Sequence, residues 1–269
     1  MAKLSKRLSK IKAKYWSEVL TAEEFIDSVS NTIQMSIKEA QQIITNFSRE
    51  EHAEFDQFKE FLLKAMAGKK PKRISVLHGK VGAWAWAIAR PIQHESLAGE
   101  MVLVYLISVQ EAFLKDYMKE ILRANTQMLM SRKQMSHEDI CSHSSFEALL
   151  DTMARLEVDE LGHGGVDDFA DAYERRFNLR FSAFQEWQAL REASFRRNIV
   201  IHNRGRADET YRAKVGIVNP GKALLTDIKY VRRIAKLLKR FFSFVHKHVS
   251  RKFELKPSLD IKSRQISVS

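Results

Sequence analysis

The sequence has few of the residues that cross-link a chain or interrupt its helices. Cys141 is the one cysteine among 269 residues, which excludes an internal disulfide framework and suits a reducing compartment. There are 4 prolines and 10 glycines, and none of them lies within residues 1–67. Because Gly and Pro mark turns and helix ends, their scarcity favours long helices.

Long apolar runs are also missing. The longest, MVLVYLI (101–107), is far shorter than the ~20 residues that a membrane span needs. The N-terminal MAKLSKRLSKIKAK carries six Lys or Arg and no acid, and no apolar stretch of signal-peptide length follows it. We therefore expect a soluble, cytoplasmic protein that does not enter a membrane.

Several catalytic motifs are absent as well. There is no P-loop, dinucleotide-binding glycine motif, G-x-S-x-G or H-E-x-x-H, which disfavours ATPases, Rossmann enzymes, esterases and zincins. HEDICSH (137–143) gathers metal-ligating side chains, but its spacing matches no zinc pattern, and Cys141 could equally be an ordinary loop or cap residue. We predict neither a metal nor a cofactor.

Positive charge is concentrated in the last part of the chain. The net charge is +12, yet residues 196–269 hold 19 Lys or Arg against 5 Asp or Glu, a net +14, while residues 1–195 carry −2. A basic patch of this kind attracts phosphates and anionic surfaces. A basic, solvated face would have the same composition, so charge alone does not define a binding site.

Hydrophobic spacing predicts an all-α protein. A capping box at Thr21 and Glu24 is expected to begin one amphipathic helix. The strongest prediction is a helix over 94–124, whose apolar residues cover most of its circumference and place it centrally in a bundle. Further helices are predicted around 55–62, 145–158, 167–176, 183–204 and 222–252.

One stretch, 74–90, is ambiguous. Trp84, Trp86 and Ile88 alternate with alanines, which suits a strand, while the alanine content suits a helix equally well. Periodicity alone does not separate the two.

The most unusual stretch is FRRNIVIHNRG (195–205), which combines basic residues with β-branched apolar ones and contains no carboxylate. Gly205 suits the C′ position of a helix that ends near Asn203 or Arg204. Basic residues also complement the negative end of a helix, and this reading alone would account for the composition. A solvated basic face, however, would normally include Asp or Glu.

The spacing within this stretch permits chemistry on a phosphate. Arg197 and His202 lie about 140° apart around a helix and roughly 7.5 Å apart along it, so both heads can reach one phosphate across the helix end. His can move protons near neutral pH, and Arg can stabilise charge on a phosphate in transit. RNA supplies its own nucleophile, the 2′-hydroxyl, so no metal would be needed.

Residues 197–202, RNIVIH, match the R-x₄₋₆-H motif of HEPN domains, including the polar residue that often follows the Arg. The predicted helix over 94–124 resembles the first core helix of the RiboL-PSP-like HEPN branch, and the basic helix around IKYVRRIAKLLKRFF is also similar. The resemblance covers about 94–252. It implies a HEPN-like helical domain over 91–252, with a helical region of unknown role at 1–90 and a tail at 253–269.

The resemblance also implies site residues. Arg197 and His202 would be catalytic, and Asn198 would orient the His or bind phosphate. Arg196, Arg204 and Arg206 would bind the RNA backbone, by charge and proximity. Glu111, a polar residue in an apolar helix, could face the cleft, could cap a helix or could lie at the surface.

HEPN folds typically dimerise, and many are metal-independent endoribonucleases in toxins, phage defence or RNA processing. The expected protein is thus a homodimeric nuclease that leaves 2′,3′-cyclic phosphate and 5′-hydroxyl ends, with an antitoxin or other regulatory partner possible. The alternatives are a non-catalytic RNA-binding or dimerising scaffold, and a basic helix that binds anionic membranes.

Overall fold

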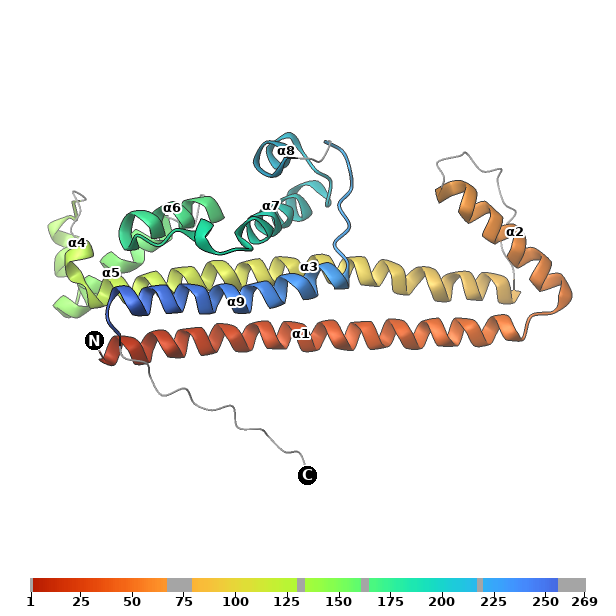
Figure 1. Ribbon diagram of the computed structural model, residues 1–269, viewed down its shortest axis with the longest axis horizontal. Helices are drawn as coiled ribbons and strands as arrows, with labels where there is room; N and C mark the ends of the chain where they lie inside the picture. The colour runs from red at the N-terminus through yellow and green to blue at the C-terminus, as the bar shows by residue number, and fades with distance from the viewer. Residues whose placement is uncertain (1, 67–78, 130–133, 161–164, 217–219, 256–269) are drawn as a thin grey trace, which may run out of the picture.

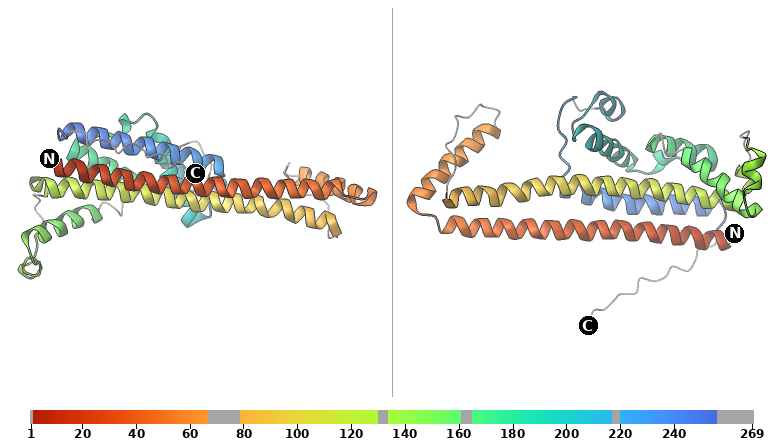
Figure 2. Two further views of the ribbon diagram at one scale, coloured as in Figure 1. Left: turned by 90° about the horizontal axis from the view of Figure 1, so that it is seen from below. Right: turned by 180° about the vertical axis from the view of Figure 1, so that it is seen from behind.

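Three long helices form the body of the molecule. The computed structural model describes residues 2–66, 79–129, 134–160, 165–216 and 220–255. In it α1 (Ala2–Thr45), α3 (Gly79–Ala124) and α9 (Ile228–Lys252) lie side by side (Figures 1 and 2). Helix α9 runs parallel to α3 and antiparallel to α1 in these views.

The remaining helices are shorter and lie mostly on one side of this body. They are α2 (Arg49–Met66), η1 (Thr126–Leu129), α4 (His137–Cys141), α5 (Phe146–Asp159), α6 (Val166–Phe177), η3 (Phe181–Ala183), α7 (Trp187–Asn203) and α8 (Glu209–Val215). The described residues contain no strand, only an isolated bridge between Arg206 and Ala223. The all-α helical bundle predicted from the sequence is confirmed.

Helix α9 shows why the sequence folds in this way. Its buried residues recur every three or four positions, and the Asp227 side chain caps its first turn by accepting from the Tyr230 N–H at 2.8 Å. This cap places the start of the helix at Ile228 and not at the expected 222. On α3, Phe113 stacks on Phe242 of α9 with 4.2 Å between ring centroids, which locks the two helices together.

Helix α1 belongs to the same core. Leu4, Leu8 and Val19 are buried in the cluster that also holds the apolar residues of α3 and α9. The apolar stripe begins well before Thr21, so the helix start predicted there is wrong, and Thr21 lies inside α1. Helix α1 therefore packs along both α3 and α9 and is part of the three-helix body (Figure 1).

Helix α3 resolves most of the ambiguous stretch. Residues 79–90 are helical, while residues 74–78 lie outside the described residues. The helix continues through Pro91, so the expected boundary between residues 90 and 91 falls inside one element. At the other end of the chain, Phe253 and Leu255, which the sequence assigned to a tail, are buried in the core.

By length and composition, residues His94–Ala124 of α3 could cross a membrane. Half of the apolar window is buried inside the protein. A central helix of a bundle has the same character, because it needs apolar side chains on most of its faces.

Gly99 sets how closely the chain crosses α3. A Cβ at this position would overlap the carbonyl oxygen of Thr226 and lie 2.9 Å from the Thr226 carbonyl carbon. Only a glycine lets this backbone lie so close to the helix. The crossing segment leads directly into the Asp227 cap of α9, so Gly99 helps to fix where α9 begins.

Candidate functional site

The motif stretch lies at the C-terminal end of α7, as the sequence predicts. The helix ends at Asn203, and Arg204 and Gly205 follow in left-handed conformation with φ of 50° and 71°. The Gly205 N–H donates to the Ile199 carbonyl at 3.0 Å, which satisfies a carbonyl that the helix leaves open. Gly205 thus occupies the C′ position expected for it.

Arg197 is held against α3 by a carboxylate. Its Nη2 donates to Glu111 Oε1 at 2.6 Å, and its Nη1 donates to Asn198 Oδ1 at 3.0 Å. The side chains of Arg197 and Glu111 are 19% and 29% exposed. The guanidinium is therefore partly buried and fixed in orientation, and Glu111 is the partner of an ion pair and not a solvated surface acid.

His202 lies on the same helix end but in a different setting. It is exposed, and within the described part of the chain it makes no hydrogen bond. Asn198 is exposed as well and contacts Arg197, not His202. The structure thus joins Arg197 and Asn198 and leaves the imidazole open to solvent, about one and a half turns further along α7.

Arg196 is occupied by structural contacts. Its Nε donates to Glu192 at 2.7 Å, its Nη1 donates to the Leu225 carbonyl at 2.7 Å, and the group lies 4.1 Å from the Tyr230 ring centroid. Its side chain is 14% exposed. Arg196 therefore ties α7 to the segment before α9 and offers a phosphate very little surface, unlike its expected RNA-binding role.

Glu192 is the centre of this structural cluster. Tyr211 of α8 donates to Glu192 Oε1 at 2.6 Å, and Tyr230 of α9 donates to Oε2 at 2.7 Å. Burial, followed by the nearby carboxylate, raises the pKa of both phenols far above their ordinary range. The two tyrosines stay protonated donors, and one carboxylate connects three helices.

Arg204 and Arg206 are the exposed cations after the helix end. Arg206 donates from Nη1 to the Gly221 carbonyl at 3.1 Å, and its own carbonyl accepts from Asn203 Nδ2 at 2.6 Å. Both arginine side chains remain exposed. Both follow His202 closely in the chain, and their expected role in RNA binding stays a prediction.

The carboxylates near the motif could not be found from its local sequence. Glu111 precedes Arg197 by 86 residues, so no spacing rule connects them. Glu192 lies one turn before Arg196, just outside the acid-free stretch. The stretch 195–205 itself holds no Asp or Glu, but folding brings Glu111 to Arg197, and Glu192 of the preceding turn binds Arg196.

Comparison with known proteins gives no relative. No family model, no curated protein and no solved structure matches this chain. The HEPN resemblance therefore rests on the sequence alone.

HEDICSH forms no metal centre in the described residues. His143 bonds through Nδ1 to the Asp139 carbonyl at 2.7 Å and through Nε2 to Thr152 Oγ1 at 2.9 Å. No group of three or more potential metal-ligating side chains lies together in the described residues. The ring of His143 instead connects α4 to α5.

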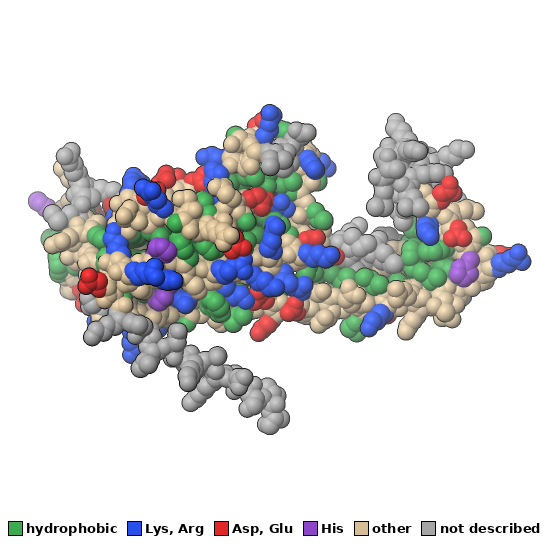
Figure 3. Space-filling model, in the orientation of Figure 1, with side chains coloured by type: hydrophobic (Ala, Val, Ile, Leu, Met, Phe, Trp, Pro, Cys, Tyr) green, Lys and Arg blue, Asp and Glu red, His purple; other side chains and the backbone are tan. Residues whose placement is uncertain are grey.

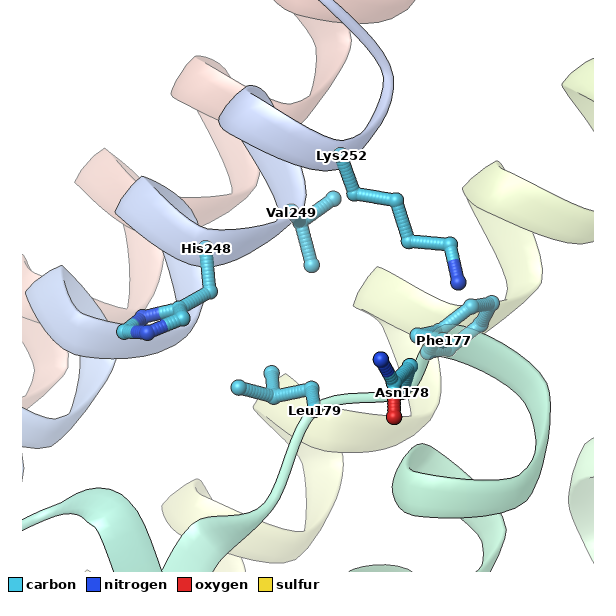
Figure 4. A pocket seen from close by; sticks show the side chains of 6 residues that line it. All are labelled: Phe177, Asn178, Leu179, His248, Val249 and Lys252. Atoms are coloured by element: carbon cyan, nitrogen blue, oxygen red, sulfur yellow. The ribbon is translucent and has the colours of Figure 1, made fainter.

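A separate cleft of about 280 Å³ lies at the far end of α9. Phe177, Asn178 and Leu179 line it on one side and His248, Val249 and Lys252 on the other (Figure 4). It is roughly 27 Å along α9 from Tyr230 and so does not belong to the α7 motif. His248 is anchored there by the Phe244 carbonyl at 3.0 Å.

Proposed function

We propose that the protein is a metal-independent endoribonuclease of the HEPN type and that the end of α7 is its active site. The observation that carries this proposal is the contrast between Arg197, fixed by Glu111, and the exposed His202 beside it. A fixed guanidinium suits charge stabilisation, and an open imidazole suits proton transfer.

The reaction needs only groups that this chain and RNA supply. The 2′-hydroxyl oxygen attacks phosphorus, the bond from phosphorus to the 5′-oxygen breaks, and a 2′,3′-cyclic phosphate and a 5′-hydroxyl result. His202 accepts the proton of the 2′-hydroxyl or gives one to the leaving oxygen. Arg197 stabilises the negative charge that develops on the phosphoryl oxygens, while Asn198 keeps one edge of the guanidinium in place.

A second copy of the chain would complete this site. One protomer offers one imidazole, and a phosphate bound beside it would be open to solvent. Ile201, next to His202, is 49% exposed, and Leu225, whose carbonyl binds Arg196, is 69% exposed. These apolar side chains beside the motif favour a homodimer in which two motifs face one another.

The decisive experiment is an RNase assay with EDTA present, on wild type and His202→Ala. We expect wild type to cleave in EDTA and His202→Ala to lose cleavage while its circular dichroism is unchanged, because the exposed imidazole contributes no packing. Cyclic phosphate ends on the product would identify the attacking group. Cleavage by His202→Ala at the wild-type rate, or activity that returns only with Mg²⁺ or Mn²⁺, would contradict the mechanism.

The second candidate is a non-catalytic RNA-binding or dimerising scaffold. The ion pair between Arg197 and Glu111 favours this scaffold, because the charge of Arg197 is already balanced in the free protein. RNA binding without cleavage by wild type would select this candidate. If the nuclease is a toxin or a phage-defence effector, growth arrest on expression should disappear in His202→Ala, and a regulatory partner would restrain the wild type.

A further inference from the structure

A groove of about 360 Å³ lies between α1 and α9, lined by none of the motif residues on α7. Trp16 and Lys12 of α1 line it, together with His246 of α9, and Ser9 and Ser17 add hydroxyl groups. The two helices lie side by side when the molecule is seen from the α1 side (Figure 2). The groove therefore joins parts of the chain that are more than 200 residues apart.

Trp16 is surrounded by cations. The ammonium groups of Lys12 and Lys239 lie 5.7 and 5.9 Å from the centroid of its ring. Lys239 is neutralised by Glu23 at 2.5 Å, whereas Lys12 has no carboxylate partner in the described residues. The groove thus presents a half-exposed indole and one unpaired cation on a flexible stem.

His246 is positioned by the core below it. Its Nδ1 lies 2.5 Å from the hydroxyl of Tyr117, and Tyr117 is fully buried in α3. The rings of Tyr117 and His246 also meet edge to face, with 6.2 Å between centroids. This wall of the groove is therefore rigid, as a binding surface for a flat ligand requires.

The surroundings are strongly positive. Residues 3–14 of α1 contain six Lys or Arg and no acid, and α9 contains nine Lys or Arg and no acid. Helices α1 and α9 are neighbours, and Lys and Arg side chains gather over α9 in Figure 3. An anionic chain would be attracted along this side.

We propose that the α1/α9 groove is a second RNA-binding site, at which one base of a single strand stacks on Trp16 while Lys12 binds the neighbouring phosphate. Cationic grooves with an aromatic ring are how proteins hold single strands without reading sequence. This inference rests on the proposed function for the identity of the ligand, RNA. The groove would bind the RNA and would not cleave it.

A single strand fits these features better than a duplex or a membrane. In a duplex the bases are already stacked on one another and are not available to an indole. A membrane would gain from several exposed apolar residues in a row, whereas two serines, a lysine and a histidine line this groove beside Trp16. The indole of Trp16 can stack on the base of one nucleotide, and the ammonium of Lys12 can bind its phosphate.

The test measures binding of labelled single-stranded 2′-O-methyl RNA, which has no free 2′-hydroxyl and so is not cleaved by the proposed reaction. Trp16→Leu should weaken binding about 5-fold to 150-fold, the range of one stacked base, and Trp16→Phe should restore most of it. On RNA with abasic positions, wild type and Trp16→Leu should bind alike. Equal affinity of wild type and Trp16→Leu for the base-bearing RNA would overturn the proposal.

Lys12→Gln and Lys10→Gln form a matched pair. Both remove one positive charge from the same helix, but Lys10 is exposed and does not line the groove. Lys12→Gln should lower the slope of log affinity against log salt by about 0.7, and Lys10→Gln should change it less. Equal slopes for the two variants would show that only net charge matters and would overturn the assigned role of Lys12.

Two further outcomes separate this site from the proposed nuclease. Binding that depends on Trp16 in a protein that never cleaves RNA would support the groove and reject the nuclease. Cleavage that depends on His202, with RNA affinity independent of Trp16, would support the nuclease and reject the groove. Binding to phosphatidylserine vesicles that depends on Trp16, without RNA binding, would assign the groove to a membrane surface and overturn the proposal.

Discussion

At the scale of single residues, the ion pair between Arg197 and Glu111 is the feature on which the proposed chemistry depends. An unpaired arginine at a helix end would sample many orientations. Here one edge of the guanidinium faces Glu111 and another faces Asn198. The planar fork is thus pre-organised before any RNA arrives, which is how a fixed charge becomes effective in a transition state.

Arg197→Lys should lose at least ~100-fold in kcat, the usual cost of removing one preorganised donor. Lysine can keep the charge and the pairing with Glu111, but it cannot contact Asn198 and a phosphate through one rigid plane. Single-turnover cleavage rates with unchanged RNA affinity would verify this. Full activity of the lysine variant would mean that Arg197 acts only as a positive charge.

Glu111→Gln tests the positioning itself. The amide keeps the size and an acceptor oxygen but removes the charge, so the orientation of Arg197 is weakened while the cation stays. We expect kcat to fall about 10-fold with KM little changed, in line with ~1.5 kcal/mol for a charge-assisted hydrogen bond. A rise in KM alone would instead indicate that Glu111 affects RNA binding through net charge.

These residue contacts mark the limit of what the sequence could provide. The motif, its position at a helix end and the role of Gly205 follow from local spacing and turn chemistry. The partner of Arg197 does not, because Glu111 is on another helix, and the same holds for the tyrosines that engage Glu192. Arg196 and Arg204 look alike in the sequence, yet one is nearly buried and the other exposed.

At the scale of helices, the position of α7 depends on its neighbours α6 and α8. Arg191 of α7 donates to Asp167 of α6 through Nε at 2.7 Å and through Nη2 at 2.9 Å. Its Nη1 donates to the Lys214 carbonyl of α8, also at 2.7 Å. One guanidinium therefore joins three helices at the start of the element that carries the motif.

This contact predicts a pH-dependent stability. Hydrogen bonds from Arg191 hold the pKa of Asp167 below its ordinary value of 3.8. A lowered folded-state pKa means that Asp167 stabilises the fold above pH 3.8, and that this contribution is lost as the pH falls through the folded-state value. Asp167→Asn should therefore lower Tm by about 2 °C at pH 7 and have no effect at the acid end.

Thermal melts of both proteins between pH 7 and pH 2 would measure this difference. Asp168→Asn is the matched control, because Asp168 is adjacent and of the same charge type but makes no ion pair in the described residues. A constant difference between wild type and Asp167→Asn at all pH values would exclude the ionised carboxylate as its cause.

Helix positions were largely predictable, and the reasons for the errors are physical. Helices α5, α6 and α7 begin and end within a few residues of their predicted spans, because each has an apolar face and a local cap or turn. Helix α9 ends at the predicted residue but begins later than predicted, at its Asp227 cap. The start of α1 was misplaced because a Thr followed by Glu is also tolerated inside a helix. The helical structure of residues 79–90 could not be predicted from periodicity, because it depends on packing against α2. There the rings of Trp84 and Phe55 meet edge to face, with 4.5 Å between centroids.

At the scale of the whole molecule, the proposed homodimer can be tested by its mass. The chain has a mass of 31.2 kDa, so light scattering should give about 62 kDa at micromolar concentration. Ile201→Glu places a charge on the exposed apolar surface beside His202 and should yield folded monomers with strongly reduced cleavage. A fully active monomer, either wild type or variant, would contradict the shared site.

Leu97→Glu is the control for this experiment. Leu97 is also a strongly exposed apolar residue, and it lies on α3 and not on α7. It should leave the mass and the cleavage rate unchanged. Dissociation by Leu97→Glu and not by Ile201→Glu would move the dimer interface to the α3 surface.

The crossing at Gly99 has a consequence for which mutations the gene can tolerate. Any larger residue there would push the Thr226 backbone away from α3 and disturb the cap of α9, so the cost falls on the assembly of the fold and not on catalysis. In a saturation screen, Gly99 should be as intolerant as His202, but for a different reason. Variants at His202 should accumulate as inactive protein, whereas variants at Gly99, alanine included, should be cleared by cellular proteases before they accumulate.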